Sequence, residues 1–266
     1  MLAGIVALCA SVCPHACKLP CKELLGKQEQ DCRACPDTRP RCKHGTLVSE
    51  EEMAFLNTRL QLVTDEALKY VGPTYFRRNG HSGQVPEEIT MLRTVVNGNR
   101  PRGGVHTVCE VGFNAGHSAT VWLDSLDTKL KSFDLFRLPY SNASSSRLAT
   151  VYPGRIEFFK GPSQVTVPQY ISSVRGGTQP LCDVWFVDGD HNRAAPEVDL
   201  RNALQASAKG AVIIADDCSA RFPAVQYAWR KLIKEGLIAD MFNRTLVTPP
   251  PGGLKGWCVG HNTERA

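Results

Sequence analysis

The chain has 266 residues, of which 42% are hydrophobic, and this is enough for one large domain and a small appendage. Its 31 basic and 26 acidic residues give a formal net charge of +5. The basic residues are spread along the sequence without a stripe interleaved with aromatic residues, which argues against nucleic-acid binding. No apolar run reaches the roughly 18 residues that a membrane-spanning helix needs.

The N-terminus, residues 1–13, is apolar and carries no charge before Lys18. It is a candidate signal peptide with cleavage after Ser11, although the positive n-region of such peptides is missing. The alternative is a buried or disordered N-terminus. A signal peptide predicts the secretory pathway or the extracellular space, and its absence predicts the cytoplasm.

Residues 14–45 form a Cys-rich appendage, and seven of the eleven cysteines fall within the first 42 residues. Disulfides are the favoured state of these cysteines, since cleavage after Ser11 would leave six. Zinc bound by Cys17-x3-Cys21 with Cys32-x2-Cys35 is the rival interpretation, and the absence of any defined role is the third. The remaining cysteines fall at apolar places, which predicts ordinary core thiols. These are Cys109, Cys182, Cys218 and Cys258.

Residues 46–100 are expected to form a helical lead-in. A capping box at Ser49 and Glu52 begins one helix, Gly72-Pro73 ends it, and Pro86 begins a second. From residue 101 to residue 266 strands and helices alternate, which predicts a parallel sheet covered on both faces. The expected strands are Thr107–Val111, Lys131–Leu135, Ile156–Phe159, Asp183–Val187, Ala211–Ala215 and Gly256–Val259. The expected helices lie near His117–Ser125, Asn192–Ser207 and Phe222–Gly236. The predicted fold class is therefore α/β, a Rossmann-like, doubly wound, mostly parallel sheet with a helical N-terminal extension.

The first strand of this sheet leads into a glycine-bearing turn and then a helix, over residues 108–118. Such a turn builds a nucleotide-type pocket at the carboxyl end of an open sheet. Gly112 and Gly116 carry no Cβ and let the backbone approach a ligand. Glu110 is expected to make the pocket entrance negative. The G-x-x-x-G spacing differs from the dinucleotide fingerprint, so an NAD-linked enzyme is disfavoured.

Three further strands end in acids. Asp134 closes the second strand, where a carboxylate can accept hydrogen bonds from a ribose diol. Asp188 closes the fourth strand, and Asp216 and Asp217 close the fifth. Adjacent strand ends lie roughly 5 Å apart, so these carboxylates should converge at one edge of the sheet, with Asp190 close by. Their mutual repulsion favours a hard divalent cation such as Mg²⁺, held by Asp188, Asp216 and Asp217.

At these residues the chain resembles the class I S-adenosylmethionine-dependent methyltransferases. Within them it is similar to the metal-dependent small-molecule O-methyltransferases of the catechol and macrocin/novobiocin sugar types. The pattern Glu110-x-Gly112-x-x-x-Gly116 resembles the first cofactor motif, and Gly161 to Gln164 resembles the loop beside the adenine. The resemblance implies that S-adenosyl-L-methionine is bound by Glu110, Gly112, Asn114, Gly116, Ser118, Asp134, Ser163, Gln164 and Asp188.

The resemblance also implies methyl transfer to a hydroxyl of a small polyhydroxylated molecule, such as a sugar, a polyol or a catechol-like compound. Catechol-type enzymes have a lysine base where this chain has His191, and the sugar-type enzymes use an Asp that corresponds to Asp190. Asp190 and His191 are therefore the two candidate catalytic bases. Loops around 138–146 and 244–254, together with residues 49–84, are expected to contact the acceptor.

Two other functions remain open on the same fold. One is a metal-independent methyltransferase with a nitrogen or carboxyl acceptor. The other is a catalytically silent, secreted binding protein whose partner site lies in the Cys-rich head. The sequence predicts no nucleic-acid partner and no spanning helix, and it leaves the oligomeric state undetermined.

Overall fold

The computed structural model describes residues 50–78, 85–98, 106–124, 128–248 and 253–263. The signal-peptide and Cys-rich-appendage predictions lie outside these residues. The strands are β1 (His106–Val111), β2 (Thr128–Asp134), β3 (Ile156–Lys160), β4 (Cys182–Val187), β5 (Ser207–Asp216), β6 (Ile238–Thr248) and β7 (Gly253–Asn262). The helices are α4 (Glu50–Leu68), α5 (Pro73–Arg78), α6 (Pro86–Gly98), α7 (His117–Leu123), α8 (Ser141–Val151), α9 (Ser163–Arg175), α10 (Ala195–Gln205) and α11 (Pro223–Lys234).

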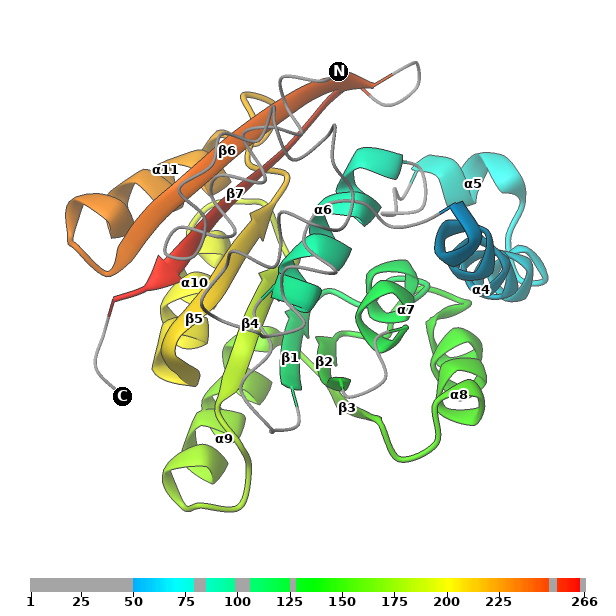
Figure 1. Cartoon of the computed structure of the whole chain (residues 1–266), viewed down its shortest axis with the longest axis horizontal. Coiled ribbons are helices and arrows are strands. Elements are labelled where there is room, and N and C mark those ends of the chain that lie inside the picture. Colours follow the sequence, from blue (N-terminus) through cyan, green and yellow to red (C-terminus); the bar gives the residue numbers. More distant parts are fainter. Residues whose placement is uncertain (1–49, 79–84, 99–105, 125–127, 249–252, 264–266) are drawn as a thin grey trace, which may run out of the picture.

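The seven strands form one sheet in the order β3-β2-β1-β4-β5-β7-β6 (Figure 1). β1 to β5 are parallel, while β7 runs antiparallel to both β5 and β6. The strand order reverses between β1 and β4, and open α/β sheets bind ligands outside the carboxyl ends of the strands at such a point. The predicted fold class is confirmed.

Side chains alternate along the central strands because successive residues of a strand point to opposite faces. Val108 of β1 joins a core with α4, α6, α7 and α8, whereas Val111 joins a second core with α9, α10 and α11. The helical lead-in therefore shares a core with the sheet: Leu56 and Leu60 of α4 belong to the first of these clusters. Among the described helices, none combines the length and the apolar character needed to cross a bilayer.

Four elements were not predicted: α8, α9, β6 and the six-residue α5, which begins at the Pro73 that we expected to end the preceding helix. Ser-rich α8 carries few large apolar residues and begins inside the segment that we expected to be an acceptor-binding loop. α9 packs Val167, Tyr170, Ile171 and Val174 at helical spacing, but Pro168 lies within it. β6 is an edge strand whose apolar residues are interrupted by the polar residues 243–245, so it lacks the continuous apolar run of a central strand. The second expected acceptor loop, 244–254, falls largely on β6 and β7, and its residues 249–252 lie outside the described part of the chain.

The prediction of four core thiols is wrong about their oxidation state. Cys109 pairs with Cys182 and Cys218 pairs with Cys258 as two disulfides, with Cα–Cα distances of 5.9 Å and 5.6 Å. All four residues are buried, as predicted. An apolar setting looks the same for a thiol and for a half-cystine, and the partners are 73 and 40 residues apart in the sequence. Only the fold brings them together.

Candidate functional site

The glycine turn leaves β1 in a conformation that few residues adopt. Gly112, Asn114 and Gly116 all have positive φ, at 97°, 52° and 87°. The Gly112 amide donates to the Phe133 carbonyl at 2.8 Å, which carries the hydrogen bonding of β1 and β2 on into the turn. The Asn114 side chain accepts from the Tyr140 hydroxyl at 2.7 Å. The turn is thus fixed from both sides before any ligand binds.

Asp134 closes β2 beside this turn, at the position the sequence predicted. Its Oδ2 accepts the Phe113 amide at 2.7 Å and the Asn114 amide at 3.2 Å. The carbonyl oxygen of Asp134 accepts the Gly161 amide at 2.9 Å. That bond brings the segment leading into Ser163 and Gln164 next to Asp134. Ser163 is half-buried and Gln164 is exposed at the start of α9.

Glu110 does not make the pocket entrance negative, and this expectation is corrected. Its side chain is fully buried and accepts from the Ser118 hydroxyl at 3.0 Å and the Ser132 hydroxyl at 2.8 Å. Burial raises the pKa of Glu110 to about 8, against the lowering effect of the two serines. At neutral pH this carboxyl is therefore mainly protonated. Glu110 and Ser118 tie β1, β2 and α7 together beneath the turn.

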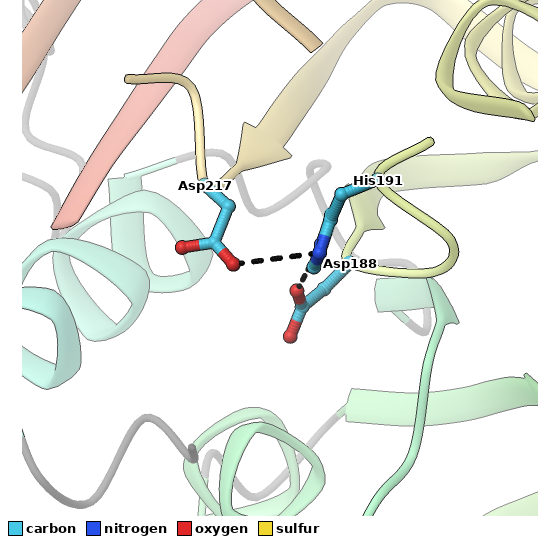
Figure 2. Close-up of side chains that lie close together, drawn as sticks. All are labelled: Asp188, His191 and Asp217. Atoms are coloured by element: carbon cyan, nitrogen blue, oxygen red, sulfur yellow. Dashed lines mark hydrogen bonds and ion pairs between the residues drawn. The ribbon is translucent and has the colours of Figure 1, made fainter. Parts of the chain in front are cut away.

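The ends of β4 and β5 bring Asp188 and Asp217 to the two sides of one imidazole. His191 Nε2 lies 3.2 Å from Asp188 Oδ1, and His191 Nδ1 lies 3.6 Å from Asp217 Oδ2. Figure 2 shows the ring between the two carboxylates. Burial lowers the pKa of His191, but the hydrogen bond and the charge of Asp188 outweigh burial and raise it to about 9.

Asp190 does not join this group. It is exposed, and its Oδ1 accepts the Asn192 amide at 3.0 Å and the Asn192 side-chain amide at 2.8 Å. Such a bond from an Asp to the backbone two residues on is a turn-forming contact. Of the two candidate bases, only His191 lies among the acids at the ends of β4 and β5.

Lys255 of β7 reaches the same edge, although the sequence did not predict it there. Its ammonium is hydrogen-bonded to Asp216 Oδ2 and lies 3.3 Å from Asp217 Oδ1 and 3.6 Å from Oε2 of Glu88 on α6. Lys255 directly precedes the last expected strand, Gly256–Val259, but the sequence does not say where that strand inserts in the sheet or in which direction it runs. We call Asp188, Asp216, Asp217, Glu88, His191 and Lys255 the acid rim.

The predicted metal set of Asp188, Asp216 and Asp217 does not assemble. Asp216 is 1% exposed and turned to Lys255. The described residues that could hold an ion together are Asp188, His191 and Asp217, whose ligand atoms lie within 4.8 Å of one another. In that group the His191 ring already stands between the two carboxylates (Figure 2). A cation could take all three ligands only if this ring moved.

Comparison with known proteins identifies the kind of domain in which these residues lie. Residues 109–218 match the family model described as "Methyltransferase domain", and no curated protein sequence matches the chain. The matched segment begins at β1 and ends just after the Asp216-Asp217 pair. It therefore contains the glycine turn, Asp134 and the acids of β4 and β5.

Solved structures share the fold at low sequence identity. The O-methyltransferase from Bacillus cereus in complex with SAH is 15% identical, with a TM-score of 0.59, over 77% of this chain and 90% of that chain. TomG from Streptomyces achromogenes, an O-methyltransferase involved in tomaymycin synthesis and solved with SAM, is 17% identical, with a TM-score of 0.57, over 76% and 89%. The N-methyltransferase NodS from Bradyrhizobium japonicum is 13% identical, with a TM-score of 0.52, over 77% and 98%. Residues 109–218 thus match a methyltransferase domain, and the chain has the fold of these solved methyltransferases.

Proposed function

We propose that this chain transfers a methyl group from S-adenosylmethionine to a hydroxyl of a small polyhydroxylated molecule, such as a sugar, a polyol or a catechol-like compound. One observation carries the proposal: an imidazole lies between two carboxylates, at the carboxyl edge of the sheet and beside the glycine turn. A hydroxyl is a poor nucleophile until its proton has an acceptor, and this group can provide one.

The cofactor would lie across the ends of β1, β2 and β4. The glycine turn fits this place, because Gly112 and Gly116 allow its positive-φ backbone, at the ends of these strands, to pack against Asp188, Leu148 and Phe113. Asp134 would accept from the ribose hydroxyls, and Ser163 and Gln164 would lie near the adenine. Asn114, Gly116 and Asp188 complete the contacts. When bound, the cofactor supplies a methyl group on a positively charged sulfonium, and the neighbouring acids favour that charge.

His191 is the proposed proton acceptor. Its side chain is 22% exposed, so a substrate can reach it, and both ring nitrogens are oriented by carboxylates. With its pKa at about 9 the ring is mainly protonated at neutral pH, and it takes the hydroxyl proton in the neutral form, which alkaline pH favours, as the oxygen attacks the methyl carbon. Most of the acceleration would come from holding the two reactants together, which can supply several kcal/mol.

A divalent cation assisting the same reaction is the second candidate. The observation that favours it is the approach of ligand atoms from Asp188, His191 and Asp217 to within 4.8 Å of one another. These residues would hold the ion, and the ion would lower the pKa of the acceptor hydroxyl. Loss of transfer in EDTA, restored by Mg²⁺, would favour this candidate.

The test begins with the purified full chain and calorimetry with S-adenosylhomocysteine, which establishes that the cofactor site works. Transfer of a labelled methyl group is then measured to catechol, to a sugar and to an acyclic polyol. Matched acceptors carry the competing groups on one scaffold: 1,2-diaminobenzene for nitrogen and benzoic acid for carboxylate. We expect the label on oxygen. Cofactor binding with methylation of the diamine alone, or with no transfer to any hydroxyl compound, would overturn the proposal.

A further inference from the structure

Lys255 is placed at the acid rim by an antiparallel strand inserted between β5 and β6 (Figure 1). β7 pairs Trp257 with Asp216, so Lys255 lies two residues along the same strand and reaches back to the rim. Its side chain is only 20% exposed, and all three of its ion-pair partners are carboxylates. Asp216 lies at the end of β5 and Asp217 in the turn after it, whereas Glu88 lies on α6.

The carboxylates that meet Lys255 need its charge. Asp216 is 1% exposed and Glu88 is 0% exposed. An ionised carboxylate out of contact with water is very costly unless an opposite charge lies beside it. Lys255 provides that charge for both carboxylates, because its ammonium is hydrogen-bonded to Asp216 Oδ2 and lies 3.6 Å from Glu88 Oε2.

The ammonium of Lys255 occupies the position that a divalent ion bound between Asp216 and Asp217 would take. The ammonium spans these two residues, because it contacts Asp216 Oδ2 and lies 3.3 Å from Asp217 Oδ1. The approach between Asp188 and Asp217 is spanned by His191. A divalent ion at the rim would stand beside a fixed positive charge, and two such charges a few ångströms apart repel strongly where water is scarce.

We propose that Lys255 supplies, from within the chain, the positive charge that a divalent cation would bring to the rim, and that methyl transfer needs no added metal. This rests on the proposed function. Lys255 is a positioning residue, since it holds Asp216 and Asp217 around the acceptor oxygen instead of reacting. In the step itself the acceptor O–H bond breaks and its proton passes to His191. The new O–C bond forms as the C–S bond breaks, and the electron pair of that bond stays on sulfur.

The test compares Mn²⁺ binding and methyl transfer in the wild type and in Lys255→Met, which keeps the length of the side chain and removes its charge. We expect no Mn²⁺ binding to the wild type by calorimetry and full transfer in EDTA. In Lys255→Met, transfer should fall at least 100-fold, and Mn²⁺ binding should become measurable by the same calorimetry. Lys255→Arg, which restores a cation, should recover at least a tenth of the transfer rate. Lys234→Met is the matched control, because Lys234 is an exposed lysine in the last turn of α11.

Stoichiometric Mn²⁺ binding to the wild type, with transfer abolished by EDTA and restored by Mn²⁺, would overturn this inference. So would unchanged transfer in a folded Lys255→Met. The Mn²⁺ titration of the wild type needs no variant, and it stands if Lys255→Met does not fold. It also needs no acceptor, so it still tests Lys255 if the chain methylates no hydroxyl compound. A chain that methylates no hydroxyl compound would overturn the proposed function, whereas the Mn²⁺ titration would still decide the inference about Lys255.

Discussion

Gly112 and Asp188 approach so closely that a Cβ atom on Gly112 would stand 2.0 Å from the carbonyl oxygen of Asp188. The Asp188 amide donates to the Val111 carbonyl at 2.8 Å, so the two strand ends are fixed to each other at this point. The glycine turn and the acid rim are therefore one rigid unit. A substitution in the glycine turn should therefore alter the acid rim, and a substitution in the rim should alter the turn.

Gly112→Ala should disrupt both the turn and the rim. The substitution adds a clash with backbone atoms to the cost of a positive φ, and the backbone can relieve the clash only by moving Asp188. We expect a loss of stability of about 3 kcal/mol or more, together with loss of S-adenosylhomocysteine binding. Urea unfolding and calorimetry measure the two effects.

Gly154→Ala is the matched control for that prediction. Gly154 also has positive φ, at 70°, but an added Cβ would meet nothing within 4 Å. Gly154→Ala should lower the stability of the fold only through its unfavourable backbone conformation, by about 1 kcal/mol, and leave cofactor binding intact. Equal losses in the two variants would show that the contact with Asp188 contributes nothing.

Glu110→Gln should stabilise the chain at alkaline pH. Burial holds the pKa of Glu110 at about 8 in the folded state, above the ordinary value of 4.5. The folded state therefore binds the proton more tightly, and the wild type loses stability as the pH rises from 4.5 to 8. The loss is roughly 1.4 kcal/mol per pH unit at most. Glutamine has the same shape and no charge to bury, so the variant should lack this slope.

Urea unfolding of the cofactor-free protein at pH 5 and at pH 8.5 checks the Glu110 prediction. We expect the difference between wild type and Glu110→Gln to grow with pH in favour of the variant. Ser132→Ala should act in the opposite sense, because it removes a hydrogen bond that favours the charged form. Parallel pH profiles for wild type and Glu110→Gln would contradict the prediction.

Asp190→Asn and His191→Gln should separate the two candidate bases. Asp190 is exposed and engaged with Asn192, so its amide variant should keep turnover within a few-fold of the wild type. His191→Gln removes the proposed proton acceptor, and the expected loss in kcat is about 10²- to 10⁴-fold. Single-turnover methyl transfer at saturating cofactor measures both. A large loss in Asp190→Asn with little loss in His191→Gln would return the role to Asp190.

The Cys218–Cys258 disulfide joins the loop after Asp217 to β7. Closing a loop of this length typically stabilises a protein by about 2 to 4 kcal/mol. The double variant Cys218→Ala/Cys258→Ala should lose stability in this range. Dithiothreitol should lower the unfolding midpoint of the wild type further than that of the double variant, which keeps only Cys109–Cys182. A wild type indifferent to dithiothreitol would show that the cysteines are thiols.

The parallel part of the sheet could be predicted because its strands are apolar runs that end in acids or glycine. That pattern is enough to place Glu110, Asp134, Asp188 and Asp217 at the carboxyl edge of the sheet. It could not give the directions of the side chains. Glu110 turns into the core to meet Ser118 and Ser132, and Asp190 turns outward to form a hydrogen-bonded turn.

The unpredicted features depend on pairings that are distant in the sequence. Lys255 reaches the rim only because β7 inserts antiparallel beside β5. The interrupted apolar pattern of the edge strand β6 did not predict the β6–β7 hairpin that places Lys255 there. The same insertion brings Cys258 to Cys218. Local pattern carries no information on such long-range neighbours.

The insertion of β7 also has a consequence for biosynthesis. Asp188, Asp216 and Asp217 emerge from the ribosome before Lys255 does. Until β7 takes its place, the edge of β5 is open to pairing with other chains and the buried acids lack their counter-charge. The nascent domain therefore has its greatest exposure to aggregation in the interval before its last sheet strand is released.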